Sequence, residues 1–151
     1  MGNICRSPLA EAVFRHYVKL EGLSERIVTD SAGTHGYHIG HRPDRRARQV
    51  ALQRGYRMDG ILARQFTLND FNDFDFVLAM DRDNLGTLNR VCPRAHAHKL
   101  GLLMRYAAGI TSDEVPDPYY GSLSDFNIAL DLLERGTRSF LDHLIALGEK
   151  K

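Results

Sequence analysis

Residues 76–81 read Phe-Val-Leu-Ala-Met-Asp, an apolar run without polar alternation that ends in a carboxylate. This pattern is typical of a strand buried on both faces of a parallel sheet, because neither face of such a strand meets water. Asp81 then predicts the N-cap of an amphipathic helix that ends at Pro93. A strand that leads directly into such a helix is the βα unit from which open parallel sheets are built.

The rest of the chain continues this alternation. Thr67 and Asp70 open a short helical turn. Gly22 and Gly55 each follow a predicted helix, at the position where a residue in the left-handed conformation commonly ends a helix. Helical periodicity predicts helices over residues 8–21, 43–54 and 124–147, and β-branched or apolar runs predict strands at 27–29 and 98–100. We therefore expect an α/β fold, an open parallel sheet flanked by helices, in a single domain over residues 1–151.

Length and composition exclude several classes of protein. The chain has 151 residues, of which 43% are hydrophobic and 26% charged, the usage of one soluble globular domain rather than of a disordered or fibrous chain. Its formal net charge of +1 provides no long-range field that would recruit nucleic acid or an anionic membrane. No apolar stretch approaches the ~18 residues of a membrane span and no signal-peptide pattern is present, so we expect a cytoplasmic protein. Cys5 and Cys92 are then expected to be free thiols.

The opening residues 1–8, Met-Gly-Asn-Ile-Cys-Arg-Ser-Pro, combine a flexible turn with a cation at the start of a helix. Gly2 and Asn3 tolerate left-handed backbone, so successive N–H groups can turn toward one point. The helix dipole and the guanidinium of Arg6 add positive potential there, and a tetrahedral oxyanion needs all of these donors. The alternative is an ordinary Ser-Pro helix start with Asn3 in a turn and Arg6 in solvent.

A second candidate segment lies at residues 115–121, Val-Pro-Asp-Pro-Tyr-Tyr-Gly. Two prolines stiffen the loop around Asp117, and two aromatic residues, Tyr119 and Tyr120, follow it. A carboxyl held rigidly beside aromatic walls suits proton donation to a leaving oxygen while the rings hold a flat substrate. The alternative is a proline-rich turn whose tyrosines cover the core.

Two further groups of side chains carry less weight. A metal site is not expected from the histidines, because no cysteine or carboxylate completes a zinc spacing around them, and they are interpreted as loop and surface residues. The basic cluster that begins at Arg42 is interrupted by Asp44 and is interpreted as a solvated helix face rather than a site for a phosphopeptide or nucleic acid. The histidines are His35, His38, His41, His96 and His98, and the arginines are Arg42, Arg45, Arg46 and Arg48.

Taken together, these segments resemble the low-molecular-weight protein-tyrosine phosphatases over nearly the whole chain. The resemblance implies a four-stranded parallel sheet, no metal or organic cofactor, and hydrolysis of phosphotyrosine or another aryl phosphate to inorganic phosphate in two steps through a phosphocysteine. The matching motifs, in chain order, are Gly-Asn-Ile-Cys-Arg-Ser-Pro at 2–8, Ser-Ala-Gly-Thr at 31–34, Ala-Arg-Gln at 63–65, Ala-Met-Asp at 79–81 and Asp-Pro-Tyr-Tyr at 117–120.

The resemblance also implies a role for each residue of the site. Arg6 would clamp the phosphoryl oxygens, and Asp117 would act first as general acid and then as general base. The residues that would donate backbone N–H groups to the phosphate are Gly2, Asn3, Ile4, Cys5 and Arg6. The residues that would support the loop are Asn3, Ser7 and Ser31, and those that would line the entrance and select aryl phosphates are Tyr37, Tyr119 and Tyr120.

The chain departs from the family pattern at two positions. The family has Cys, five residues and then Arg, and counting back from Arg6 places the nucleophile immediately before Met1. Cys5 corresponds instead to the family's second cysteine, which stands next to the Arg and has no evident in-line approach to phosphorus. Ile61 stands where the family often has a His that helps to support Asn3. We therefore expect the chain as given to be inactive, although the clamp and the acid are retained.

The same count implies that the first, central strand of the family fold, which launches the phosphate loop, is missing or replaced. A typical strand of about 5–6 residues buries about two or three apolar side chains at roughly 1.5–3 kcal/mol each. This loss is a large part of a domain's stability of about 5–15 kcal/mol. We expect copies of the chain to associate or to exchange elements in compensation, and Met1 to be an internal residue of a longer protein.

Three functions remain open from the sequence. The first is a phosphatase whose competence depends on residues upstream of Met1. The second is a phosphate- or phosphopeptide-binding pseudophosphatase that uses Arg6 without turnover. The third is an arsenate reductase of the same fold, which needs a relay of cysteines, and Cys92 at a helix end is far from the segment expected to supply one.

Overall fold

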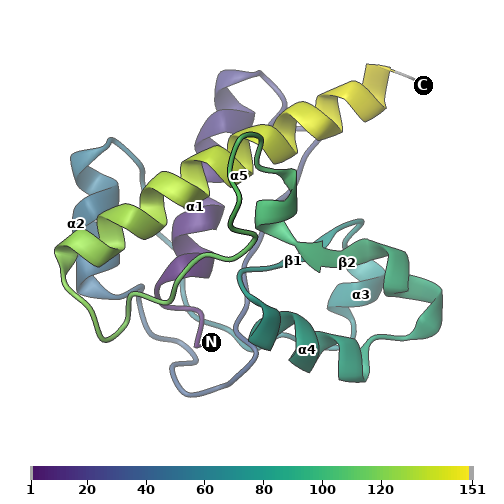
Figure 1. Ribbon diagram of the computed structural model, residues 1–151, viewed down its shortest axis with the longest axis horizontal. Helices are drawn as coiled ribbons and strands as arrows, with labels where there is room; N and C mark the ends of the chain where they lie inside the picture. The colour runs from purple at the N-terminus through teal and green to yellow at the C-terminus, as the bar shows by residue number, and fades with distance from the viewer. Residues whose placement is uncertain (1, 150–151) are drawn as a thin grey trace.

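The structure, a computed structural model, describes residues 2–149 and is an α/β fold in which helices surround a short parallel sheet (Figure 1). The α/β class expected from the sequence is confirmed. The elements in chain order are α1 (Arg6–Leu20), α2 (Arg45–Gln53), α3 (Asp70–Asp73), β1 (Val77–Ala79), α4 (Arg82–Val91), the 3₁₀ helix η1 (Arg94–Lys99), β2 (Leu100–Leu102), the 3₁₀ helix η2 (Leu103–Tyr106) and α5 (Leu123–Glu149).

The sheet has two strands among the described residues, fewer than the four that the family resemblance implies. β1 and β2 run parallel, with Val77 opposite Leu100 and Ala79 opposite Leu102. The connection between them contains α4 and η1. The strand predicted at 98–100 lies at Leu100–Leu102 instead, because the residues just before it are wound into η1.

The strand predicted at residues 27–29 does not form. These residues have no paired strand among the described residues, and Val28 is 80% exposed. The nearest pairing in residues 2–149 is an isolated parallel bridge between Gly33 and Gln65. β-branched residues favour extended backbone, but a strand also requires a hydrogen-bonded neighbour. A cavity, described below, lies between this segment and β1.

The helices begin and end close to the predicted residues. Asp44 and Asp81 cap α2 and α4 by accepting hydrogen bonds of 2.8 Å from backbone N–H groups of the first turn. Gly22 follows α1 with a φ of 69°, the left-handed conformation that glycine adopts without a steric cost. α1 starts at Arg6 rather than at residue 8, so the arginine of the predicted anion site belongs to the first turn of a helix.

The main core forms between α1 and α5, which cross in Figure 1. Leu9 and Val13 of α1 are fully buried, as are Leu130, Leu133 and Leu141 of α5. Burial of each such side chain stabilises the fold by roughly 1.5–3 kcal/mol. A second, smaller apolar cluster covers the sheet. The main core fixes α1 and, with it, the N-terminal loop that leads into this helix.

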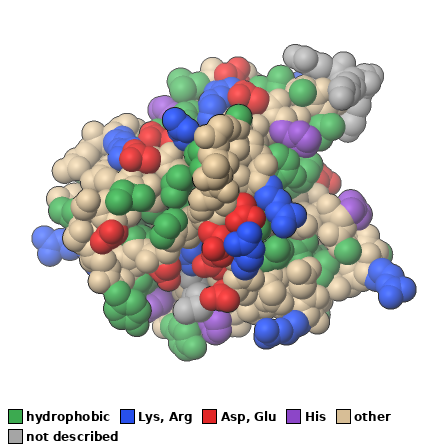
Figure 2. Space-filling model, in the orientation of Figure 1, with side chains coloured by type: hydrophobic (Ala, Val, Ile, Leu, Met, Phe, Trp, Pro, Cys, Tyr) green, Lys and Arg blue, Asp and Glu red, His purple; other side chains and the backbone are tan. Residues whose placement is uncertain are grey.

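Charged side chains of both signs are interspersed on the face shown in Figure 2. Arginines at the surface pair with carboxylates, as the exposed Arg82 does with Asp113 at 2.6 Å and the half-buried Arg138 with Asp142 at 2.7 Å. This mixture agrees with the formal net charge of +1. No helix within residues 2–149 is both long enough and apolar enough to cross a membrane.

Candidate active site

The N-terminal loop is held by the side chain of Asn3. Asn3 is 3% exposed and has a φ of 61°, a left-handed conformation that Asn adopts more readily than most residues. Its Nδ2 donates to Ser31 Oγ at 3.0 Å, and its Oδ1 accepts from the backbone N–H of Arg64 at 3.0 Å. Ile61, which stands where the family often has a supporting histidine, is buried in the core. The N–H of Arg64 therefore contributes support that the side chain of Ile61 is unable to give.

Ser31 extends this network to α1. Its hydroxyl donates to Glu11 Oε1 at 2.6 Å, and Glu11 forms an ion pair with Arg15. Burial raises the pKa of Glu11, and the hydrogen bond from Ser31 acts in the opposite direction. Ser7, the third residue expected to support the loop, lies in the first turn of α1 and lines the cavity described below.

Arg6 is buried, with 4% of its surface exposed, so the alternative of an arginine in solvent is wrong. Its Nη1 donates to Asp81 Oδ2 at 2.6 Å and to the carbonyl oxygen of Val115 at 2.7 Å, and its Nη2 donates to Asn84 Oδ1 at 3.5 Å. Burial raises the pKa of Asp81, but hydrogen bonds from the N–H of Asn84 and from Arg6 outweigh it and hold this pKa below its ordinary value. Asp81 therefore stays ionised and fixes the guanidinium at the carboxyl end of β1.

The structure brings Asp117 to Arg6 although the two residues are far apart in the sequence. Asp117 Oδ2 lies 3.9 Å from Arg6 Nη2, and the Asp117 side chain is 39% exposed. The backbone N–H of Tyr119 donates to Asp117 Oδ1 at 3.1 Å, which orients the carboxyl group. The guanidinium can bind the phosphate group of a phosphate ester, and the partly exposed carboxyl group beside it can supply a proton to the same ester.

Arg46 holds the loop that carries Asp117. Its Nη2 donates to the carbonyl oxygen of Tyr119 at 2.7 Å, and its Nη1 donates to that of Gly121 at 2.8 Å. The guanidinium also lies over the Phe126 ring, 4.5 Å from its centroid. The interpretation of the arginine cluster as a solvated helix face is therefore wrong for Arg46.

The tyrosines expected at the entrance differ in exposure. Tyr120 is 97% exposed and packs edge-on against Tyr119, with ring centroids 4.9 Å apart. Tyr37 is 73% exposed and stacks on His35 at 5.2 Å. Tyr119 and Tyr120 adjoin Asp117 in the same loop, so their rings lie where an aryl group could be held.

His38 lies in a loop, as predicted, and its side chain packs against Gly2 of the N-terminal loop. A Cβ at Gly2 would be 2.5 Å from His38 Cδ2, so a larger residue at this position would force the His38 ring to shift. The rings of His38 and Tyr119 are 6.2 Å apart, centroid to centroid. The spacing of residues along the sequence does not show which loops contact each other in the fold.

Within residues 2–149, no group of three or more His, Cys, Asp or Glu side chains is arranged to hold a metal ion.

The two cysteines differ in burial and in position. Cys5 is 7% exposed, and its burial, together with the charges of Asp44 and Asp117, raises its pKa to about 12. Because the thiolate is the attacking species in cysteine chemistry, Cys5 at neutral pH is present as the unreactive thiol. Cys92 follows α4 at the end opposite to Asp81, and a helix of this length, 10 residues, spans about 15 Å.

The sequence matches the family described as low molecular weight phosphotyrosine protein phosphatase over residues 1–150. The chain belongs to this family. A putative low molecular weight protein-tyrosine-phosphatase of Synechocystis is 43% identical over 145 residues, which cover 95% of this chain and 92% of the relative. The low molecular weight phosphotyrosine protein phosphatase of Homo sapiens is 42% identical over 144 residues, which cover 94% of this chain and 90% of the relative.

Solved structures agree with the assignment to the low molecular weight phosphatases. A protein tyrosine phosphatase from Entamoeba histolytica superposes with a TM-score of 0.93 and 39% identity, covering 97% of this chain and 93% of that one. YfkJ from Bacillus subtilis superposes with a TM-score of 0.92 and 36% identity, covering 100% of this chain and 92% of that one. The family resemblance and the fold class drawn from the sequence are therefore both confirmed.

Proposed function

We propose that this chain forms the catalytic domain of a phosphatase that binds phosphotyrosine, or another aryl phosphate, in the loop of residues 2–6. The observation that carries the proposal is the 3.9 Å approach of Asp117 to Arg6, because the phosphate clamp and the proton donor must act on the same ester. The human relative is a phosphotyrosine protein phosphatase by name, which supports the same substrate class.

The loop and the clamp supply the binding half of this function. The backbone N–H groups of residues 2–6 precede or begin α1, where the helix dipole adds positive potential. Asp81 and Val115 hold Nη1 of the Arg6 guanidinium, and Nη2 makes a long hydrogen bond of 3.5 Å to Asn84, so Nη2 can turn its donors to phosphate oxygens. Because the guanidinium is already fixed, little conformational freedom is lost when the phosphate binds.

Asp117 supplies the acid–base half. A cysteine thiolate attacks phosphorus, the bond between phosphorus and the tyrosyl oxygen breaks, and Asp117 donates its proton to that leaving oxygen. In the second step Asp117 takes a proton from water as the water oxygen attacks phosphorus, and the thiolate leaves while inorganic phosphate forms. Tyr119 and Tyr120 hold the aryl group beside Asp117.

We also propose that residues 1–151 alone do not turn over substrate. The family pattern places the attacking cysteine immediately before Met1, and the chain's own cysteines are poor substitutes. Cys5 is held as a buried thiol, and Cys92 is at the far end of α4. The same separation disfavours the arsenate reductase alternative, which needs cysteines that can reach one another.

Hydrolysis of p-nitrophenyl phosphate tests both proposals. We expect no turnover by residues 1–151, and turnover by a form extended at its amino end with a β-branched strand that ends in Cys. Replacing that added Cys by Ser should abolish turnover, whereas Cys92→Ser should preserve it. If the extended form is inert, the phosphatase proposal is wrong. Turnover that copurifies with residues 1–151 and is lost in Arg6→Lys would instead refute the proposed inactivity.

A second candidate function, phosphate binding without turnover, is favoured by the burial and fixed position of Arg6. Calorimetry of residues 1–151 with inorganic phosphate or vanadate at millimolar concentration measures it. We expect binding by the parent chain and by Arg82→Met, whose altered residue is exposed, and no binding by Arg6→Met. Absence of heat with the parent chain would contradict the role of the loop in both candidate functions.

A further inference from the structure

Two exposed arginines lie beside the phosphate loop, one just before α2 and one at its first residue. Among the described residues, the side chains of Arg42 and Arg45 take part in no ion pair. Residues 31–58 contain six arginines and a single carboxylate, Asp44, whereas the whole chain has a formal net charge of only +1. Positive charge is therefore concentrated in this stretch of the sequence.

Asp44, which interrupts the arginines in the sequence, is paired with a different one. Its carboxylate accepts three hydrogen bonds from Arg46, one from the backbone N–H and two from the guanidinium. Burial raises the pKa of Asp44, but these hydrogen bonds outweigh it and hold the pKa below its ordinary value. Asp44 is therefore ionised and bound to Arg46, so it does not neutralise Arg42 or Arg45.

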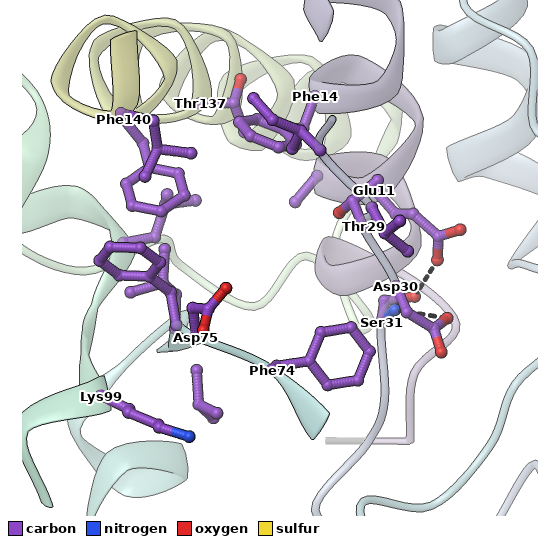
Figure 3. Close-up of a pocket in the computed structure, with 18 of the residues that line it drawn as sticks. Glu11, Phe14, Thr29, Asp30, Ser31, Phe74, Asp75, Lys99, Thr137 and Phe140 are labelled. Carbon is purple, nitrogen blue, oxygen red and sulfur yellow. Dashed lines mark hydrogen bonds between the residues drawn. The ribbon is translucent and has the colours of Figure 1, made fainter. Parts of the chain in front are cut away.

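The segment that carries the two arginines is bonded directly to the phosphate loop. The backbone N–H of Asp44 donates to the carbonyl oxygen of Ile4 at 2.7 Å, so α2 begins beside the loop that leads into α1 (Figure 1). The loop is also held by Ser31, which accepts a hydrogen bond from Asn3 and donates one to Glu11 (Figure 3). The phosphate loop and the start of α2 are therefore fixed relative to each other.

Arginine is an unfavourable residue at the start of a helix. The helix dipole makes the first turn positive, so acidic residues stabilise this turn and cations destabilise it. α4 and α5 each have an aspartate there, but the first turn of α2 has no acidic residue and begins with Arg45 and Arg46. Arg46 has a structural reason, since it holds the loop of Asp117. Arg45 pairs with no carboxylate in the part of the chain that the structure describes, and a local rule broken without such a gain is expected at a functional position.

α4 also begins beside the phosphate loop, but its charges are balanced. Asp81, which caps α4, binds the Arg6 guanidinium. Arg82, the next residue, pairs with Asp113 at 2.6 Å and with Glu114 at 3.5 Å. A peptide bound at the phosphate loop therefore meets unpaired positive charge at the start of α2 and paired charges at the start of α4. Acidic side chains of the peptide are attracted to the first of these regions.

We propose that Arg42 and Arg45 bind carboxylates of the substrate, so that the chain favours a phosphotyrosine flanked on one side by acidic residues. The inference rests on the proposed function, because it describes the peptide around the phosphate that Arg6 binds. An extended peptide rises about 3.4 Å per residue, so acidic side chains within three residues of the phosphotyrosine start at most about 10 Å from it. Exposed ion pairs are individually weak, so the two arginines select among phosphopeptides and the phosphate loop supplies most of the affinity.

Fluorescence anisotropy with labelled phosphopeptides tests the preference on residues 1–151, because it measures binding and requires no turnover. Three peptides share a central phosphotyrosine in a Gly-Ser background: one carries three glutamates before it, one carries them after it, and one carries glutamines at all six positions. We expect one of the two glutamate peptides to bind about fivefold tighter than the glutamine peptide. This advantage should shrink at about 500 mM salt, because the charges are exposed. Equal binding of all three peptides refutes the inference alone, and absence of binding by all three refutes the phosphate site as well.

Two double variants with the same change in charge separate a local site from a general effect. The variant with Arg42→Gln and Arg45→Gln should bind all three peptides equally, with an affinity for the glutamine peptide within about twofold of that of the parent chain. The matched control has Arg90→Gln and Arg94→Gln, at exposed positions near the far end of α4, and should keep the preference. A preference that survives in the first variant, or is lost in the control, would contradict the proposal.

Charge reversal provides a sharper variant. Arg45→Glu places an acidic residue in the first turn of α2, where the helix dipole favours it, so the fold should be retained. This variant should bind the preferred glutamate peptide no better than the glutamine peptide, and an unchanged preference would show that Arg45 does not contact the substrate.

An arginine surface can also attract nucleic acid or an anionic membrane, and two further probes test these partners. The probes are single-stranded DNA and vesicles of phosphatidylcholine and phosphatidylserine in equal parts. We expect neither to bind more strongly to the parent chain than to the variant with Arg42→Gln and Arg45→Gln, because the formal net charge is only +1. Binding of either probe that this variant loses, together with equal affinities for the three peptides, would assign the surface to that partner and overturn the proposal.

Discussion

The two sides of β1 differ in how completely they are packed. On one side β2 completes a parallel ladder, and Leu102 and Phe71 are fully buried. On the other side a cavity of about 1420 Å³ lies between β1 and residues 26–32. The N-terminal loop of residues 2–6 leads into Ser7, which lines the open side, and the side chains of Asn3 and Arg6 in this loop are held by hydrogen bonds. Side chains from helices and loops therefore hold the site together where the sheet does not.

Removal of the Arg6 guanidinium is expected to give the largest loss of stability. Arg6→Met leaves the Asp81 carboxylate, 20% exposed, and the Val115 carbonyl without their donor, so the free energy of unfolding should fall by about 3–5 kcal/mol. Arg82→Met is the matched control, because Arg82 is 62% exposed where it pairs with Asp113, and it should cost less than about 1 kcal/mol. Urea unfolding measures the free energy of unfolding of both variants, and equal losses of stability would mean that Arg6 does not hold the site.

Truncation along α5 compares the packed and hollow sides directly. Leu141 is fully buried, whereas Leu144, one turn later, is partly buried and lines the cavity. Leu141→Ala opens a new void in dense packing and should lower the free energy of unfolding by about 3 kcal/mol. Leu144→Ala only enlarges an existing hollow and should cost about 1 kcal/mol. If urea unfolding shows similar losses, the cavity is closed in solution.

The sequence predicts best those features that depend on residues close together in the chain. The N-cap at Asp81 and the apolar run before it follow from a few neighbouring residues, and the structure has both. The strand predicted at 27–29 was wrong because a strand depends on a partner that is distant in sequence, and three β-branched or apolar residues do not reveal whether that partner is present.

A residue of the site could be predicted from the sequence only where it belongs to a recognisable motif. Arg6 and Asp117 lie in two short segments whose residue types suggest an anion site and a proton donor, the family resemblance assigns their roles, and the structure brings them together. Arg46 was missed because its position on α2 gives no sign of the carbonyl group that it binds 73 residues away. His38 was missed for a similar reason, since its contact with Gly2 joins two loops.

Loss of Arg46 is expected to loosen the Asp117 loop at a smaller cost than loss of Arg6. Arg46→Gln removes hydrogen bonds to the carbonyl groups of Tyr119 and Gly121. Each is worth about 1 kcal/mol, so the free energy of unfolding should fall by about 1–2 kcal/mol, and amide exchange should quicken at residues 115–121. Arg45→Gln, at the adjacent exposed position of α2, should change neither the free energy of unfolding nor the amide exchange at residues 115–121. Unchanged exchange in Arg46→Gln would contradict its role as a positioning residue.

The smallest effect is expected at Glu11, which joins the two regions because it lines the cavity and accepts a hydrogen bond from Ser31. Burial raises the pKa of Glu11 above its ordinary value of 4.5, so folding favours the protonated form. The stability that this preference contributes is complete below pH 4.5 and is lost as the pH rises through the folded-state pKa. Glu11→Gln keeps an acceptor for Ser31 but does not titrate, so it should lose less stability than the parent chain as the pH rises.

Urea unfolding of both proteins at about pH 4.5 and about pH 7 measures this difference, and Glu25→Gln, at an exposed carboxyl, is the matched control that should follow the parent chain. Water inside the cavity would hydrate the Glu11 carboxylate and remove the cause of its raised pKa. Identical pH courses for Glu11→Gln and the parent would therefore mean that the open side of β1 is filled with water. A smaller loss in Glu11→Gln would mean that the cavity is dry around this carboxyl group.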